Sequence, residues 1–156
     1  MSFYMPAEFE KQQAAVLIFP ELPGSWGRSV RAASAFAEII NTIAKHERVY
    51  VAVNEKSRAN AEKLLDRENI TLLDIPSDDA WARDVAPTFV RDRESGEVRG
   101  ISWKFYAWGG EYDGLYADWA KDDALAEEFC RQHGQDARIS NHIALCIEEM
   151  AGNVIR

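Results

Sequence analysis

The sequence is poor in the residues that build metal sites, disulfide frameworks and membrane spans. Its 156 residues include three histidines and two cysteines, Cys130 and Cys146. No pair of them has metal-ligand or Cys-x-x-Cys spacing, so we expect no metal, no other cofactor and no disulfide framework. The longest apolar run, residues 14–20, is too short to cross a membrane. The N-terminus lacks the pattern of a signal peptide, so we expect a cytoplasmic protein without a membrane partner.

The chain also lacks an excess of basic residues. Eighteen Lys and Arg against 26 Asp and Glu leave a net charge of −8. A protein this acidic repels phosphate backbones, so we expect no nucleic-acid partner, whereas a small cationic ligand is compatible with the charge. The apolar share of 47% indicates a globular chain, and its length suits one domain, which we predict over residues 1–156.

Hydrophobic periodicity and turn residues predict an α/β (α+β) protein with mixed sheets and flanking helices. Strands are expected at residues 14–19, 48–53, 70–75 and 143–147. Helices are expected at 29–46, at 119–133, and from an N-cap at Ser57 to about Arg67. Residues 87–92 and 98–105 flank the turn 93–97 and predict a β-hairpin. Residues 108–116 are expected to form a glycine-punctuated loop.

The stretch "DDAWARD", residues 78–84, combines a tryptophan with several charges directly after a predicted strand. The ends of strands in α/β proteins are common ligand sites. A planar cation is well recognised by an aromatic face and by carboxylates that accept paired N–H bonds, and Trp81 and Asp84 could face one pocket. The alternative is an Asp-rich helix cap with Trp81 packed beneath it. Residue types alone favour this alternative.

A second stretch, "WGGEYDGLY" at residues 108–116, mixes glycines, rings and carboxylates. It suits the rim of a site for a cationic ligand, and a compact surface loop pinned by its own aromatic side chains explains it equally well. Two acidic and aromatic segments in one chain strengthen the interpretation as a cation site. By contrast, Cys130 and Cys146 are expected to be inert packing thiols, and His46 and His133 to close helices.

Several motifs in order resemble the N-terminal half of the agmatine deiminase family, also called the bacterial peptidylarginine-deiminase-like family. They are "MPAEFE" (5–10), "VYVAVN" (49–54), "SDDAWARDVAPTFV" (77–90), "GISWKFYAWGG" (100–110) and "GLYADWAKDDALA" (114–126). The resemblance covers about residues 5–130. It implies part of a pentein-type propeller built of ββαβ modules.

The resemblance also implies hydrolysis of a guanidinium C–N bond, which converts agmatine into N-carbamoylputrescine and ammonia. In the family a cysteine thiolate attacks the guanidinium carbon and a histidine activates water. Carried over residue by residue, the motifs make Asp84 a catalytic carboxylate and Trp81 a pocket wall, with Asp79 and Arg83 in support. We also expect Trp108 to bind substrate.

The resemblance places a second carboxylate near the end of the chain. One register puts Glu148 at that position, and the other puts Met150 there. The family's cysteine and histidine belong to its C-terminal half, so we expect a homo-oligomer or a separate C-terminal half as partner.

Three functions stay open for the chain alone. It could be an incomplete agmatine or arginine deiminase-type hydrolase. It could be a guanidinium-binding module without catalysis, or an inactive remnant.

Overall fold

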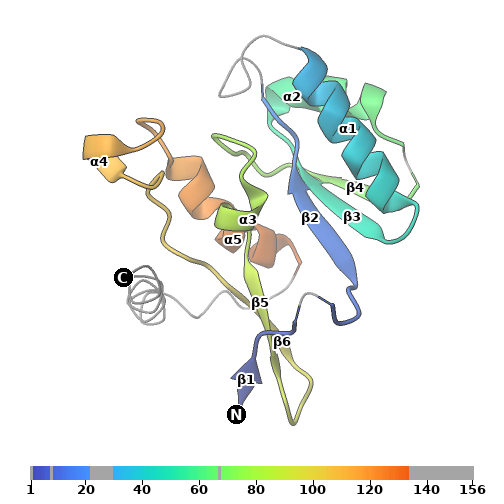
Figure 1. Ribbon diagram of the computed structural model, residues 1–156, viewed down its shortest axis with the longest axis vertical. Coiled ribbons are helices and arrows are strands. Elements are labelled where there is room, and N and C mark those ends of the chain that lie inside the picture. Colours follow the sequence, from blue (N-terminus) through green and yellow to red (C-terminus); the bar gives the residue numbers. More distant parts are fainter. Residues whose placement is uncertain (1, 8, 22–29, 67, 134–156) are drawn as a thin grey trace. The chain divides into compact units, whose positions relative to one another are not determined.

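The computed structural model describes residues 2–7, 9–21, 30–66 and 68–133 (Figure 1). The chain divides into two compact units, each with one three-stranded sheet. The parallel unit contains Ala7–Asp84 and residues 120–122. The hairpin unit contains residues 1–6, Val85–Trp119 and the chain from Asp123 onward. Both parallel and antiparallel pairing occur, so the predicted mixed α/β class is confirmed. That residues 1–156 form a single domain stays a prediction.

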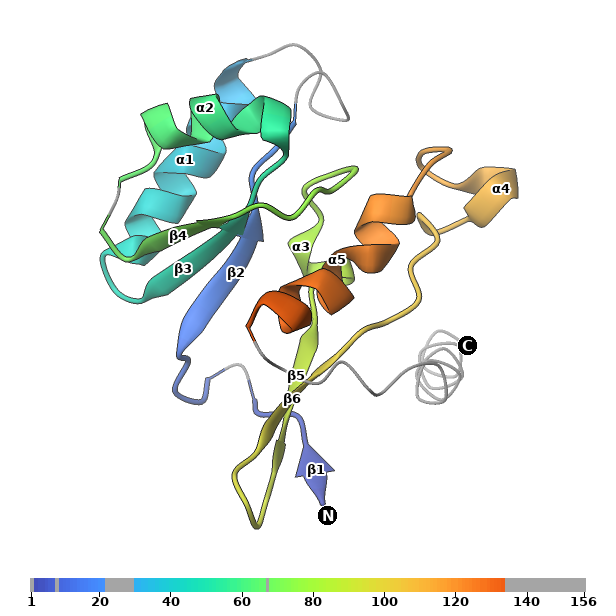
Figure 2. The ribbon, with the colours of Figure 1, turned by 180° about the vertical axis from the view of Figure 1, so that it is seen from behind.

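The parallel unit is a β-α-β-α-β segment. Its strands β2 (Ala14–Ile18), β3 (Arg48–Ala52) and β4 (Ile70–Leu73) pair in parallel in the order β2-β3-β4. Helices α1 (Val30–Ala44) and α2 (Glu55–Leu64) form the two crossovers and lie on the same side of the sheet (Figures 1 and 2). The predicted strands and helices of this region are therefore confirmed, apart from the start of α2.

The core of the parallel unit lies between β3 and the two helices. Alternate residues of a strand face the same side, so Val49, Val51 and Val53 all point toward the helices. All three are fully buried. They pack with a helical stripe that consists of Ala33, Ala37, Ile40 and Ala44, and with Phe19, Ala61 and Leu65. This packing holds β3 and its neighbouring strands in place, so the segments that follow these strands begin at fixed positions.

The prediction that Ser57 caps α2 is wrong. The helix begins at Glu55 with Asn54 as its N-cap, and Ser57 is buried in the first turn. The backbone carbonyl of Asn54 accepts the N–H groups of Ser57 and Arg58, both at 3.0 Å. The Asn54 side chain makes no bond to the helix, because it is bonded to Ser77 instead. A local capping rule therefore selected the wrong residue.

The hairpin unit contains strands β5 (Thr88–Asp92) and β6 (Val98–Ile101), which pair antiparallel as predicted. A short strand, β1 (Phe3–Tyr4), pairs antiparallel with β5 on the other side, with Tyr4 opposite Arg91. Two residues are too few for an alternating pattern, so this strand could not be recognised in the sequence. The resulting sheet has the order β1-β5-β6.

Three helices complete the described chain: α3 (Ala82–Val85), α4 (Gly110–Asp113) and α5 (Ala120–Gln132). The α5 helix confirms the helix predicted at 119–133, while α4 is a helical turn within the predicted loop. In the hairpin unit, Phe89 packs edge-on against Phe129, with ring centroids 6.1 Å apart. The strand expected at 143–147 lies outside the described residues. Within the part of the chain that the structure describes, no helix is long and apolar enough to span a membrane.

Candidate functional site

The stretch at residues 78–84 leaves the carboxyl edge of the parallel sheet, where the sequence placed it. Buried hydrogen bonds hold its entry. The Asn54 side chain, just past β3, accepts the Ser77 N–H at 3.1 Å and donates to the Ser77 carbonyl at 3.1 Å. Both residues are buried. The chain that follows β4 is thus tied to the end of the neighbouring strand.

Asp79 holds the ring of Trp81. Its carboxylate accepts the indole Nε1–H of Trp81 at 2.9 Å through one oxygen and the N–H of Ala80 at 2.8 Å through the other. Asp79 is only 6% exposed, and Trp81 is half-buried. A buried carboxylate with donors on both oxygens orients a ring well, and the geometry suits the supporting role expected for Asp79.

Asp84 is in a different situation. It lies in α3, where its backbone N–H donates to the Trp81 carbonyl at 3.0 Å, and its side chain is exposed, like that of Arg83. Among the described residues, no hydrogen bond or ion pair engages the Asp84 carboxylate. The turn therefore contains one uncommitted carboxylate, that of Asp84, which is exposed and has no hydrogen-bond or ion-pair partner among the described residues. It lies three residues from the Trp81 ring, whose orientation Asp79 fixes. Such a pair can receive a planar cation.

The capping alternative is also partly correct, although for another helix. Asp78 accepts backbone N–H groups of α5 rather than of α3, the helix that follows it in sequence. The three carboxylates of residues 78–84 therefore fall into two groups. Asp78 and Asp79 are engaged by protein donors, and Asp84 is not.

Trp108 lies in the hairpin unit, and its expected contact with the substrate stays a prediction. Its backbone has φ 60°, and that of Ala107 has φ 52°. Two successive non-glycine residues in the left-handed region are uncommon and persist where surrounding contacts hold them. The Leu115 N–H donates to the Ala107 carbonyl at 3.0 Å, and the Trp108 ring stands edge-on to Phe105 at 5.1 Å.

The loop that follows Trp108 is compact. A Cβ atom at Gly109 would overlap the backbone of Asp113, so only glycine fits there. The Gly114 N–H donates to the Gly110 carbonyl at 3.1 Å and closes the turn of α4. These contacts match the compact-loop alternative, and a role as the rim of a cation site stays a prediction for residues 108–116.

The prediction that Cys130 packs inside the fold is confirmed. Cys130 is 1% exposed, and burial raises the pKa of its thiol, with Glu127 adding to the effect. A buried thiol with a raised pKa is a poor nucleophile. His133 is the C-cap of α5, as expected, and stacks on Phe129. Glu148, Met150 and Cys146 lie outside the described residues.

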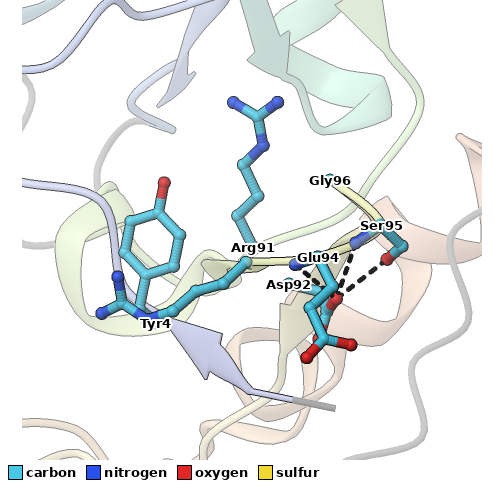
Figure 3. Close-up of a pocket in the computed structure, with 7 residues that line it drawn as sticks. Tyr4, Arg91, Asp92, Glu94, Ser95 and Gly96 are labelled. Carbon is cyan, nitrogen blue, oxygen red and sulfur yellow. Dashed lines mark hydrogen bonds between the residues drawn. The ribbon is translucent and has the colours of Figure 1, made fainter.

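A hollow of about 370 Å³ at the hairpin contains none of the predicted site residues. Its lining consists of Tyr4, Arg91, Asp92, Arg93, Glu94, Ser95 and Gly96 (Figure 3). Within this lining, Asp92 is fixed by several hydrogen bonds. It is 3% exposed and accepts the N–H groups of Ser95 at 2.9 Å and Glu94 at 3.0 Å. The Ser95 bond contributes most to a pKa of about 2 for Asp92. These contacts explain the carboxylate as a stabiliser of the turn.

The chain belongs to the family of Porphyromonas-type peptidyl-arginine deiminases, whose model matches residues 4–148. The resemblance seen in the sequence is thereby confirmed. A protein of Selenomonas ruminantium assigned as an agmatine deiminase is 46% identical over 140 residues, which is 86% of this chain and 37% of the relative. One of Mycoplasma capricolum is 43% identical over 129 residues, with 82% and 35% covered.

Solved structures agree with the sequence comparison. The agmatine deiminase of Enterococcus faecalis superposes with a TM-score of 0.80 at 36% identity, over 86% of this chain and 36% of that one. The described fold is therefore that of part of an agmatine deiminase. The chain spans little more than a third of the length of these relatives.

Proposed function

We propose that this chain supplies part of the guanidinium-binding site of an agmatine deiminase-type hydrolase. The observation that carries the proposal is the pairing of an uncommitted, exposed Asp84 carboxylate with a Trp81 ring that Asp79 holds in place. The family membership and the agmatine deiminase relatives support the choice of a guanidinium substrate. Agmatine is the substrate we expect.

The chemistry is hydrolysis of a guanidinium C–N bond. Agmatine and water yield N-carbamoylputrescine and ammonia. Asp84 accepts guanidinium N–H bonds and keeps the carbon oriented for attack, while the Trp81 ring offers its face to the planar cation. Arg83 and Trp108 are proposed as further contacts, and Glu148 as the second carboxylate.

The nucleophile is proposed to come from outside the described residues. Cys130 cannot serve, because it is buried and burial raises the pKa of its thiol. Attack on the guanidinium carbon needs an accessible thiolate. The match covers only 37% and 35% of the two relatives, and the missing thiolate and histidine are proposed to lie in the part that this chain does not span.

A guanidinium-binding module without turnover is the second candidate function. The same observation on Cys130 favours it, since the described residues offer an accessible carboxylate but no activated thiol. The two candidates share the binding site and differ in ammonia release.

The test measures agmatine binding by calorimetry and ammonia release in the same preparations. We expect Asp84→Ala to weaken binding about 10-fold, the loss typical of one charge-assisted hydrogen bond. Asp66→Asn is the matched control, because it removes an equal charge from an exposed side chain of the same unit. Equal weakening by both variants would reduce the effect to net charge and contradict the site.

Ammonia release after addition of a separate C-terminal half then separates the two candidates. Release that appears only on this addition and is lost in Asp84→Ala supports the hydrolase, whereas release by the chain alone contradicts the proposed place of the nucleophile. Binding without any release, even after the addition, supports the binding module. Absence of agmatine binding contradicts both.

A further inference from the structure

Helix α5 begins without a cap of its own. Its N-cap residue is Trp119, whose side chain makes no capping hydrogen bond. The helix is capped by a distant residue instead. One oxygen of Asp78 accepts the N–H groups of Lys121 at 2.9 Å and of Asp122 at 3.4 Å. A carboxylate is favoured here, because the first N–H groups of a helix lack partners and carry partial positive charge.

Asp122 returns the interaction. It lies in the first turn of α5 and is 1% exposed, and its Oδ1 accepts the N–H of Asp78 at 2.7 Å and of Asp79 at 3.4 Å. We call these reciprocal bonds between residues 78–79 and 121–122 the Asp78–Asp122 clasp. All of its residues belong to the parallel unit. The pattern is that of a capping box whose two halves are 44 residues apart.

The clasp leads directly to the ring of the candidate site. Asp122 accepts the backbone N–H of Asp79, and the carboxylate of Asp79 accepts the indole N–H of Trp81 at 2.9 Å. Two hydrogen bonds therefore separate the buried Asp122 from the Trp81 ring. We propose that Asp122 is a positioning residue of the guanidinium site, which fixes Asp79 and, through it, the orientation of Trp81. This inference rests on the proposed function for its substrate.

The burial and charge of the clasp explain why it can hold the turn firmly. The Asp78 side chain is 11% exposed, and its second oxygen lies 3.2 Å from Nζ of Lys121. The bond from the Asp79 N–H to Asp122 is buried, the two bonds between Asp78 and Asp122 are part-buried, and the bond from the Lys121 N–H to Asp78 is exposed. Removing either carboxylate leaves those donors unsatisfied and lets residues 78–79 rearrange. Asp122 thus acts on substrate only through Asp79 and Trp81.

A matched control lies next to Asp122 on the same helix. Asp123 also accepts a backbone N–H, that of Phe105 at 2.9 Å, and pairs with Lys104. These partners belong to the hairpin unit. Asp123→Ala therefore removes a carboxylate from the same helical turn and a similar set of bonds, but leaves residues 78–81 untouched. A purely structural role of Asp122 in holding α5 would make the two variants behave alike.

The experiment follows hydrogen exchange of the Trp81 indole N–H by NMR in the ¹⁵N-labelled full chain, with the resonance assigned through Trp81→Phe. We expect Asp122→Ala to speed this exchange about 10-fold. Asp122→Asn keeps an oxygen acceptor without the charge, and we expect about 3-fold. Asp123→Ala is expected to leave it unchanged. Unchanged exchange in Asp122→Ala, or an equal change in Asp123→Ala, overturns the inference; if the alanine variant does not fold, unchanged exchange in Asp122→Asn does so.

Agmatine affinity of the same variants provides the second measurement, at a temperature where each is folded. We expect about 10-fold weaker binding for Asp122→Ala and an unaltered dissociation constant for Asp123→Ala. Wild-type chain that binds no agmatine overturns the proposed function and the substrate part of this inference, and the indole exchange still decides whether Asp122 positions Trp81. Intact agmatine affinity in an Asp122→Ala variant with faster exchange overturns the link from positioning to the site.

Discussion

Two acidic turns of this chain are built in different ways. In the hairpin turn, one oxygen of Asp92 accepts the N–H groups of Glu94 and Ser95, two and three residues away. In the turn after β4, the N–H groups of Asp78 and Asp79 reach Asp122, 44 and 43 residues away. Both turns rest on a buried aspartate that accepts backbone donors.

The difference lies in how each turn depends on the rest of the chain. The bonds of Asp92 to Glu94 and Ser95 close within a few residues, so little chain entropy is lost to form them. The other oxygen of Asp92 adds one distant bond, to the Ser2 N–H at 2.9 Å. The bonds of Asp122 to residues 78–79 are all distant and form only when the first turn of α5 lies beside these residues. The hairpin turn is therefore expected to keep its local bonds when distant residues change, whereas the turn that carries Trp81 is expected to respond to such changes.

The largest expected effect is that of Asp122→Ala on stability. The variant removes the acceptor of the Asp78 N–H, whose bond is part-buried, and of the Asp79 N–H, whose bond is buried. This loss is expected to lower the free energy of unfolding by about 1–3 kcal/mol. Urea unfolding measures the change. The exposed Asp66→Ala is the control and is expected to have almost no effect. A loss at Asp122 no larger than that at Asp66 would remove the distinction between the two turns.

Gly96→Ala tests how strongly the hairpin turn depends on its own local backbone conformation. Gly96 has φ 73°, and a side chain in this region costs about 1–2 kcal/mol of stability. A Cβ there would meet only the flexible end of Arg91, so the backbone angle is the cause. Thermal unfolding should show a smaller loss for Gly96→Asn, because asparagine tolerates this conformation. Equal losses for both would contradict the account.

The acid dependence of stability should contain a contribution from Asp92. Its pKa falls from 3.8 to about 2 in the folded protein, mainly through the Ser95 N–H. A lowered folded pKa means that the carboxylate stabilises the fold above pH 3.8 and that this contribution is lost as the pH falls toward 2. Unfolding measured from pH 5 to pH 2 should therefore have a shallower pH dependence in Asp92→Asn. An unchanged profile would rule out this role.

The smallest effect is expected for Lys121→Met. The Lys121 ammonium is 3.2 Å from Asp78 but half exposed, so the ion pair contributes less than about 1 kcal/mol. The backbone bonds of the clasp remain in this variant. A loss as large as that of Asp122→Ala would show that charge pairing, rather than the backbone hydrogen bonds, holds the turn.

The regular elements were largely predictable, because their signals are local. The stripe that includes Ala33, Ala37 and Ile40 identified α1, and the β5–β6 hairpin followed from its turn residues. The start of α2 was misplaced because the Asn54 side chain bonds to Ser77, 23 residues away. Strand β1 was missed because two residues carry no pattern.

The sequence indicated where the candidate site lies in the chain, but not which of its carboxylates are hydrogen-bonded within the protein. Residue types placed Trp81 and Asp84 at the end of a strand, and the motifs indicated a guanidinium. The resemblance gave Asp84 and Asp79 different roles, but residue types alone did not distinguish the engaged carboxylate of Asp79 from the uncommitted one of Asp84, since both are aspartates in one short stretch.

The sequence by itself determined the family, the parallel β-α-β-α-β segment, the hairpin and the place of the Trp–carboxylate turn. Each of these depends on spacing or on neighbours within a few residues. Only the tertiary structure decided that Asp78 caps α5 and that Asp122 holds residues 78–79 in return. Hydrogen-bond partners more than 40 residues apart leave no local pattern, because the folded backbone, rather than the sequence spacing, brings donor and acceptor together.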